Sequence, residues 1–397
     1  MTLASRESSS RLLDRLRRVT TSGRYIPEID GLRFIAIASV FLLHLATHFG
    51  RHAASPAGAH ESWLWRGFQT GGAGVLVFFS ISGFILALPF VAAEERNGEA
   101  VALRRYYLRR LTRLEPPYVS SLLLLAAVAA WRGADAALVP HLAASLGYVH
   151  NVVYGTWSSI NPVAWSLEIE VQFYLLMPLI AKLFRWPRRV RRLLLLACIP
   201  ACIVLDELLP LRALHLDKSL LNHFQHFVPG ILFADLYATS GAAERRTHDV
   251  ERRGILWDLL ALIALIVIFS CPAAGPASMA IPFSTLLLLF ATFRSVTFRA
   301  LTRNPVIATI GGMCYSIYLL HYPLLALILP VTGRAEVPGG LGVNLLFQAL
   351  VTAPVVLGVS GLFFAFVERP CMRPNWPQRL LAWWRSGVVR SATSKLD

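Results

Sequence analysis

The sequence predicts an all-α fold, a polytopic transmembrane helical bundle of about ten spans with both termini in the cytoplasm. Three observations lead to this prediction. The composition is 55% hydrophobic and only 15% charged, whereas soluble globular proteins are about 25% charged and about 45–50% apolar. Continuous apolar segments of membrane-spanning length recur along nearly the whole chain. Lys and Arg are distributed unevenly between alternate connecting segments.

Ten apolar segments predict the membrane spans. In chain order they cover residues 31–50, 71–92, 116–131, 163–184, 193–209, 220–238, 256–272, 279–296, 306–330 and 342–367. The third span is short, and we expect a kink in the ninth near Tyr322 and Pro323, because proline removes a helical hydrogen bond. No small-residue cleavage pattern follows the first segment, so it is expected to be a retained span and not a signal peptide.

The basic residues orient these spans. With the amino terminus assigned to the cytoplasm, 29 of the 38 Lys and Arg residues lie on the cytoplasmic side, 6 lie on the other side and 3 lie within spans. Cytoplasmic loops of membrane proteins are enriched in Lys and Arg. The asymmetry predicts a multi-pass protein of the inner (cytoplasmic) membrane, in contact with membrane lipids. It also explains the net charge of +15, and no nucleic-acid partner is expected, because no soluble basic face with stacking aromatics is present.

The same map divides the chain into three parts. Residues 1–28 are expected to form a cytoplasmic basic segment, residues 29–370 a transmembrane domain, and residues 371–397 a cytoplasmic basic tail. The five cysteines fall mostly in apolar segments, and the sequence contains no CxxC motif or Cys/His cluster. Neither a disulfide framework nor a metal site is therefore expected.

The first span contains two ionisable residues, Arg33 and His44, that are eleven positions apart. Eleven residues of α-helix rotate by about 20° net and rise by about 16 Å, so both side chains project from one stripe. Ionisable groups within a membrane are costly and usually face a protein interior or a wet cavity. The pair therefore indicates a polar track. His44 is either a general base or a hydrogen-bonded core residue, and Arg33 either belongs to the track or extends to the membrane interface.

A basic segment and a stripe of small residues each have two explanations. Five arginines lie within residues 104–113. They form either a positive-inside anchor or a binding site for a polyphosphate such as coenzyme A, since guanidinium pairs well with phosphate. No Walker or GxGxxG loop is present, which argues against a nucleoside triphosphate or a dinucleotide. The small residues of the second span either pack helices closely or leave room for a narrow ligand. They are Gly71, Gly74, Ser80, Ser82 and Gly83.

The fourth and ninth spans carry further polar residues. Glu168 and Glu170 lie two positions apart and so point in different directions, and at most one of them shares a helix face with Tyr174. Counting from the span ends places Glu170 at the depth of His44, where a carboxylate could orient the imidazole. Tyr318 and His321 lie three positions apart on one face and are expected to form a hydrogen-bonded pair; His321 is equally compatible with a structural role.

Six segments together resemble the acyltransferase-3 family of integral membrane O-acyltransferases. They occur in the family's order between residues 29 and 370. They are the R-x10-H pattern of Arg33 and His44, GGAGVLVFFSISGF, Arg110-Leu111-Thr112-Arg113 with its following Pro-Pro-Tyr, WSLEIEVQFY, YSIYLLHYP and FVERP. The family's acidic position in the fourth span corresponds to Glu170, and the sequence shows no counterpart of the periplasmic hydrolase-like domain that some members carry.

The resemblance implies transfer of an acyl group, commonly acetyl, from cytoplasmic acyl-CoA to a hydroxyl of a cell-envelope carbohydrate such as an O-antigen, exopolysaccharide or glycolipid. Acetyl-CoA or another acyl-CoA would then be the donor substrate, and a glycan or lipid-linked sugar the acceptor. Arg110 and Arg113 are expected to hold the CoA phosphates. His44 would deprotonate the acceptor or carry the acyl group transiently, with Glu170 supporting it and Arg33 stabilising the donor or an oxyanion.

The remaining substrate-binding residues are also carried over from the resemblance. They are Ser82, Gly83, Tyr174, Tyr318 and His321. One alternative keeps this chemistry but transfers the acyl group to a small molecule such as a macrolide antibiotic. A second alternative is a membrane transporter that uses the intramembrane charges as a relay, although the internal repeat typical of such proteins is not evident.

Overall fold

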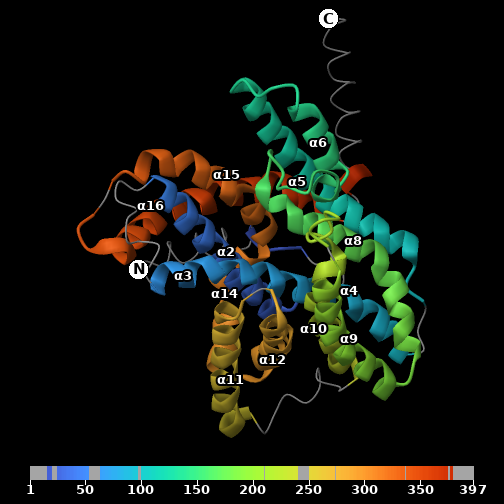
Figure 1. The fold of residues 1–397 in the computed structure, drawn as a ribbon. Coiled ribbons are helices and arrows are strands. Elements are labelled where there is room, and N and C mark those ends of the chain that lie inside the picture. The colour runs from blue at the N-terminus through green and yellow to red at the C-terminus, as the bar shows by residue number, and fades with distance from the viewer. Residues whose placement is uncertain are drawn as a thin grey trace, which may run out of the picture.

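The computed structural model describes residues 16–19, 25–52, 63–96, 100–209, 211–239, 250–272, 274–335, 337–373 and 376–378. This part of the chain is helical and contains no β-strand (Figure 1). The all-α prediction is therefore confirmed for these residues. Most of the expected N-terminal segment 1–28 and of the tail 371–397 lies outside them.

The described residues form helices along the whole order of the chain. They are α2 (Pro27–His52), α3 (Trp63–Gln69), α4 (Ala73–Glu95), α5 (Leu103–Trp131), α6 (Leu138–Leu146), α7 (His150–Tyr154), α8 (Trp165–Ile180), α9 (Arg188–Leu208), α10 (Leu220–Thr239), α11 (Val250–Ser270), α12 (Ala280–Arg294), α13 (Thr297–Thr302), α14 (Pro305–Gly312), α15 (Cys314–Thr332), α16 (Gly340–Phe363) and α17 (Arg369–Cys371). A π-helical turn, η6 (Phe364–Glu368), joins α16 to α17.

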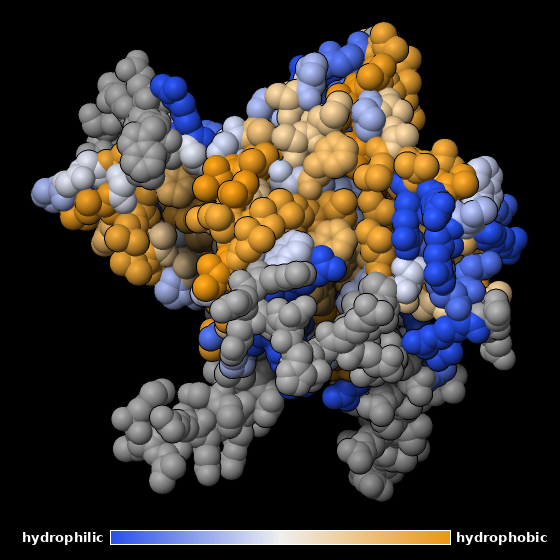
Figure 2. Space-filling model, turned by 90° about the horizontal axis from the view of Figure 1, so that it is seen from below, coloured by the Kyte–Doolittle hydropathy of each residue, from blue (hydrophilic) through white to orange (hydrophobic). Residues whose placement is uncertain are grey.

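Among the residues that the structure describes, six helical segments are long and apolar enough to cross a membrane. They are Pro27–His52, Trp65–Glu95, Leu103–Trp131, Pro276–Arg294, Cys314–Thr332 and Gly340–Cys371. Large apolar side chains also lie exposed on the outside of the bundle, for example Ile255, Leu259 and Leu262 of α11. Figure 2 shows apolar residues over a broad area of one face. Apolar surface of this extent indicates contact with a membrane.

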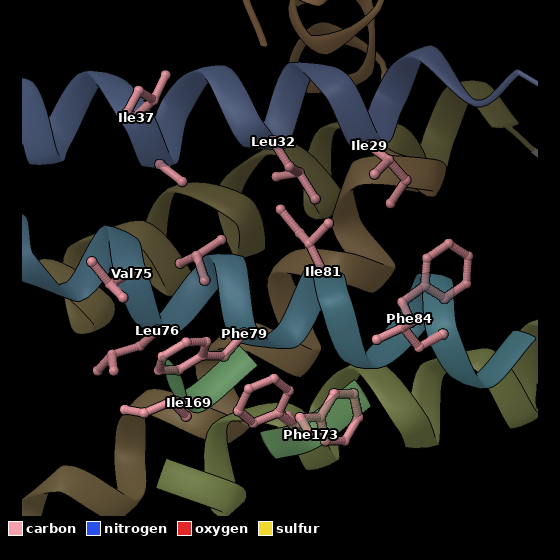
Figure 3. Packing of buried hydrophobic residues seen from close by; sticks show 14 of the residues in the cluster. Ile29, Leu32, Ile37, Val75, Leu76, Phe79, Ile81, Phe84, Ile169 and Phe173 are labelled. Carbon is pink, nitrogen blue, oxygen red and sulfur yellow. The ribbon is translucent and has the colours of Figure 1, made fainter. Parts of the chain in front are cut away.

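Helix α2 runs through the middle of the molecule and contacts α4, α14 and α15 (Figure 1). Its Leu32 and Ile37 are buried in the main core together with Val75 and Ile81 of α4 (Figure 3). A Cβ atom at Gly71 would touch Leu43, and one at Gly74 would touch Ala36 and Val40. Residues further along the α4 segment thus contact residues nearer the start of α2. The two helices are antiparallel.

Small residues of α4 pack it against α10 as well. A Cβ atom at Gly83 would overlap the carbonyl oxygen of Phe227, and one at Gly230 would overlap that of Ser80. Backbones this close leave no room for a side chain, so Gly83 and Gly230 serve helix packing. Gly83, which we expected to bind substrate, faces α10 instead.

The ninth predicted span is broken at Met313, where α14 ends and α15 begins. Near Tyr322, where we expected a kink, α15 continues through Pro323 as one helix. Since Pro323 has no N–H, the carbonyl of Leu319 loses its helical partner. The side-chain Nδ2 of Asn161 donates a hydrogen bond to this carbonyl at 3.0 Å. The freed acceptor is thereby satisfied and the helix continues.

Ion pairs join the helix ends on the arginine-rich side. Asp235 of α10 is fully buried and pairs with Arg191 and Arg192 of α9, the latter at 2.5 Å. Arg191 also pairs with Glu95 at the end of α4, at 2.6 Å. Buried charges need such partners. Asp235, which had no role in the sequence analysis, therefore ties three helices together.

Candidate active site

A cavity of about 110 Å³ is lined by residues of α2, α4, α5, α8 and α15. Four arginines and two glutamates face it, together with tyrosines, serines and apolar side chains. The charged residues are Arg18, Arg33, Arg110, Arg113, Glu170 and Glu368. Guanidinium groups bind phosphates and carboxylates through paired, charge-assisted hydrogen bonds. With four of them on its wall, the cavity is suited to a polyanion.

Arg110 and Arg113 of α5 have N–H donors without hydrogen-bond acceptors among the described residues. Within the described part of the chain neither forms an ion pair, and the Nε atom of each is buried without a hydrogen-bond partner. The Arg110 guanidinium lies 5.7 Å from the ring centroid of Tyr106 and 5.9 Å from that of Tyr174, which holds it by cation–π contacts. Buried donors without partners are costly. A bound anion would satisfy them.

Arg33 and Arg18 share one carboxylate. Nη1 of Arg33 lies 2.6 Å from Oδ1 of Asp30, and Nη1 of Arg18 lies 3.1 Å from the same oxygen. Arg33 is thus held inside the protein and does not extend to the membrane interface. Arg18 belongs to the segment that we expected to be separate from the transmembrane domain. Sequence reasoning missed it, because the positive-inside pattern already accounted for every arginine there.

Glu170, Ser82 and Tyr174 face the cavity together. Ser82 donates a hydrogen bond to Oε1 of Glu170. We expected Glu170 to support His44, but the structure gives it Ser82 as partner. Counting residues gives depth in the membrane and leaves the rotation of each helix undetermined. Glu168 points elsewhere, as its spacing predicts, and accepts a hydrogen bond from the backbone N–H of Asn151 at 3.0 Å.

Tyr318 also faces the cavity, and its hydroxyl is fixed by α8 and the turn before it. It donates to the carbonyl of Val163 at 2.8 Å and lies 2.7 Å from Oγ of Ser166. The side-chain pair that we expected between Tyr318 and His321 is therefore not formed. The carbonyl of Tyr318, and not its hydroxyl, contacts the imidazole of His321, at 2.9 Å from Nδ1.

His44 and His321 form a pair. Nδ1 of His44 lies 2.9 Å from Nε2 of His321. The His321 side chain is fully buried, and its ring centroid lies 5.8 Å from that of Tyr318, which faces the cavity. The ring of Tyr322 meets that of His44 edge-on at 5.1 Å. The partner of His44 is thus a second histidine, which is not among the cavity-lining residues.

The cavity extends from the arginines toward this pair. Its α4 wall runs from Val75 to Leu86, a rise of about 16 Å. Because the two helices are antiparallel and a Cβ atom at Gly74 would meet Ala36 and Val40, the Val75 end of this wall lies level with Ile37, between Arg33 and His44 (Figure 3). Neither His44 nor His321 lines the cavity; the cavity comes near the pair at Tyr318, whose ring centroid lies 5.8 Å from that of His321.

Other candidate sites are less developed. In the described residues, no group of three or more His, Cys, Asp or Glu side chains is placed to hold a metal ion. His223 and His226, which the sequence left unassigned, lie on α10 among aromatic rings, and the carbonyl of His226 accepts a hydrogen bond from Ser80 at 2.5 Å.

Comparison with known proteins gives three findings. A family model described as an acyltransferase domain matches residues 26–367. The O-acetyltransferase OatA of Staphylococcus aureus (strain NCTC 8325 / PS 47) is 23% identical over 89% of this chain and 58% of its own length. A protein of Staphylococcus aureus (strain COL), provisionally named as an O-acetyltransferase, is 24% identical over 92% of this chain and 61% of its own. The chain thus spans about three fifths of these relatives. No solved structure matches it.

Proposed function

This chain belongs to the acyltransferase family whose domain covers residues 26–367, and we propose that it transfers an acyl group, acetyl by preference, from cytoplasmic acyl-CoA to a hydroxyl of a cell-envelope carbohydrate. The names of its relatives support O-acetyl transfer. The acceptor class is part of the proposal and covers O-antigen, exopolysaccharide and glycolipid. A multi-pass protein of the inner membrane would meet both an intracellular donor and such an acceptor.

The proposal includes a topology. The helices form ten spans with both termini in the cytoplasm, since this arrangement places 29 of the 38 Lys and Arg residues on the cytoplasmic side. The carboxyl-terminal ends of α4 and α10, joined to α9 by Glu95, Asp235 and their arginines, then lie at the cytoplasmic boundary. In this topology the arginine end of the cavity would face the same side. A cytoplasmic thioester would therefore enter at Arg110 and Arg113.

The observation that carries the proposal is a cavity that has unpaired arginines in its wall and a histidine pair beside its Tyr318. Arg110 and Arg113 would bind the phosphates of CoA, for which they keep buried donors free. The pantetheine arm would run along α4 past Ser82, which Glu170 holds in place. The rise of about 16 Å between Arg33 and His44 is within the length of an extended pantetheine arm.

His44 would act as the general base. It would take the proton of the acceptor hydroxyl while the oxygen attacks the thioester carbonyl carbon, forming the ester C–O bond and breaking the C–S bond. The proton would then pass to the departing thiolate, so that CoA leaves as the free thiol. General-base catalysis contributes roughly 10²–10⁴-fold to such a rate. Arg33, about 16 Å from His44 along the helix, belongs to the donor site in this scheme.

The test is acyl transfer in membranes that contain the protein. Labelled acetyl-CoA is supplied with a glycan acceptor and, in a parallel arm, with a macrolide, and labelled ester is measured. We expect ester on the glycan with the wild type and almost none with His44→Ala. His52→Ala, two turns further along α2, is the matched control and should retain activity.

Each contrary result has a distinct meaning. Full activity of His44→Ala would refute the assigned chemistry. Ester on the macrolide alone would refute the carbohydrate acceptor, and solute flux into proteoliposomes without any covalent product would favour a transporter.

A further inference from the structure

The hydrogen bonds of His321 determine which of its ring nitrogens carries the proton. Nδ1 lies 3.0 Å from the carbonyl oxygen of Ile317 and 2.9 Å from that of Tyr318. Carbonyl oxygens only accept hydrogen bonds, so Nδ1 is the donor. A neutral imidazole has a single N–H. Nε2 of His321 therefore carries a lone pair.

The neutral form of both rings follows from their surroundings. The His321 side chain is fully buried, and among the described residues no carboxylate forms an ion pair with His44 or His321. The neighbouring groups are the imidazole of His48 and the phenol ring of Tyr322. An imidazolium there would be a buried charge without a counter-ion, which is costly.

The tautomer of His321 then fixes that of His44. Because Nε2 of His321 accepts, Nδ1 of His44 at 2.9 Å must donate. A neutral His44 consequently has no proton on Nε2. Within the described part of the chain this nitrogen has no hydrogen-bond partner. Of the four ring nitrogens in the pair, Nε2 of His44 is the one that can accept a proton from a substrate.

We propose that His321 is a positioning residue that holds His44 in its Nδ1-protonated tautomer, so that Nε2 is the base that meets the acceptor hydroxyl. The inference rests on the proposed function, in which His44 removes that proton. His321 acts on His44 through its acceptor nitrogen, Nε2, and contacts no reacting atom. When His44 gains a proton, its Nδ1–H remains bonded to His321, so the ring need not turn during the reaction.

The helix turn that carries His321 is itself held by residues 161–166, at and before the start of α8. Asn161 bonds the carbonyl of Leu319, and the hydroxyl of Tyr318 is bonded to Val163 and lies beside Ser166. These contacts fix the two residues that precede His321 by two and three positions. Catalytic groups need supports that keep them within a fraction of an ångström of the productive geometry. The position of His321 is consistent with such support.

The direct test reads the tautomer and does not depend on activity. The protein is labelled with ¹⁵N in its histidine rings, reconstituted in lipid and examined by solid-state NMR, with His44→Gln assigning the His44 signals. We expect a protonated Nδ1 and an unprotonated Nε2 in the wild type. A protonated Nε2 would overturn the inference, whether or not the protein transfers acyl groups. Failure of the proposed function would appear separately, as absent ester in the wild type.

The kinetic test compares His321→Leu with His321→Gln. Leucine removes the acceptor, whereas the glutamine amide oxygen can still accept from Nδ1 of His44. We expect His321→Leu to lower kcat by about 100-fold, within the range of general-base effects, with KM for acyl-CoA changed by less than about threefold. His321→Gln should recover at least about tenfold of this loss.

Equal losses in the two variants would show a merely structural role and would overturn the inference. A leucine variant with wild-type kcat would overturn it as well. The tautomer measurement on His321→Leu adds an independent readout: its His44 signals should lose the Nδ1-protonated form that the wild type and His321→Gln retain.

Discussion

Replacing Arg110 and Arg113 together by alanine is expected to weaken acyl-CoA binding by about 10²- to 10⁴-fold. Hydrogen bonds to charged groups are worth about 1.5–3 kcal/mol each, so one such bond from each arginine gives about 3–6 kcal/mol. Neither arginine is ion-paired within the described residues, so the substitutions leave no buried carboxylate without a partner. The fold should therefore persist while the affinity falls. Arg33→Ala, in contrast, would leave Asp30 with Arg18 alone.

The assay is a titration of the purified protein, in detergent or nanodiscs, with acyl-CoA. The matched control replaces Arg105 and Arg109 by alanine, because both are exposed on the same helix and neither lines the cavity. It removes the same charge and should change the affinity by less than about threefold at physiological salt, where exposed charges are screened. An unchanged affinity in the Arg110/Arg113 variant, or an equal loss in the control, would refute the assignment of the cavity as the donor site.

Two further predictions concern groups that the structure alone identifies. Arg18→Ala should weaken acyl-CoA binding by about 10- to 100-fold, since Asp30 keeps Arg33 as its partner and one charge-assisted bond is lost; wild-type affinity in the same titration would contradict it. Asn161→Ala should destabilise the protein by about 1–3 kcal/mol, because the Leu319 carbonyl is left unpaired. In a Pro323→Ala background, where an N–H returns to that carbonyl, the cost should fall by about 1 kcal/mol, as measured by detergent-induced unfolding; additive costs would contradict the coupling.

The sequence was informative about which residues share a face and less so about what that face meets. Apolar segments predicted the helices, and Arg33 and His44 both lie on α2, as the first apolar segment predicted. Ser82 and Gly83 are separated by about 100° around α4, so one reaches the cavity and the other packs against α10. Nothing local to the sequence distinguishes these two neighbours.

Long-range partners were harder to predict for a physical reason. His44 and His321 are 277 positions apart, and depth counting offered Glu170 as the more obvious partner. The rotation of each helix is set by packing, here by glycine contacts and by Asn161. The same applies to Pro323: local chemistry predicts a freed carbonyl at Leu319, and the partner of this carbonyl is the distant amide of Asn161.

The bond between Asn161 and Leu319 has a consequence for the biogenesis of the protein. Its two residues are 158 positions apart, so Asn161 emerges from the ribosome long before α15 is translated. A carbonyl without a partner in an apolar environment costs several kcal/mol. We therefore expect α15 to reach its final position only after the segment that carries Asn161 is in place. The histidine pair, which includes His321 of α15, would form in the same late step.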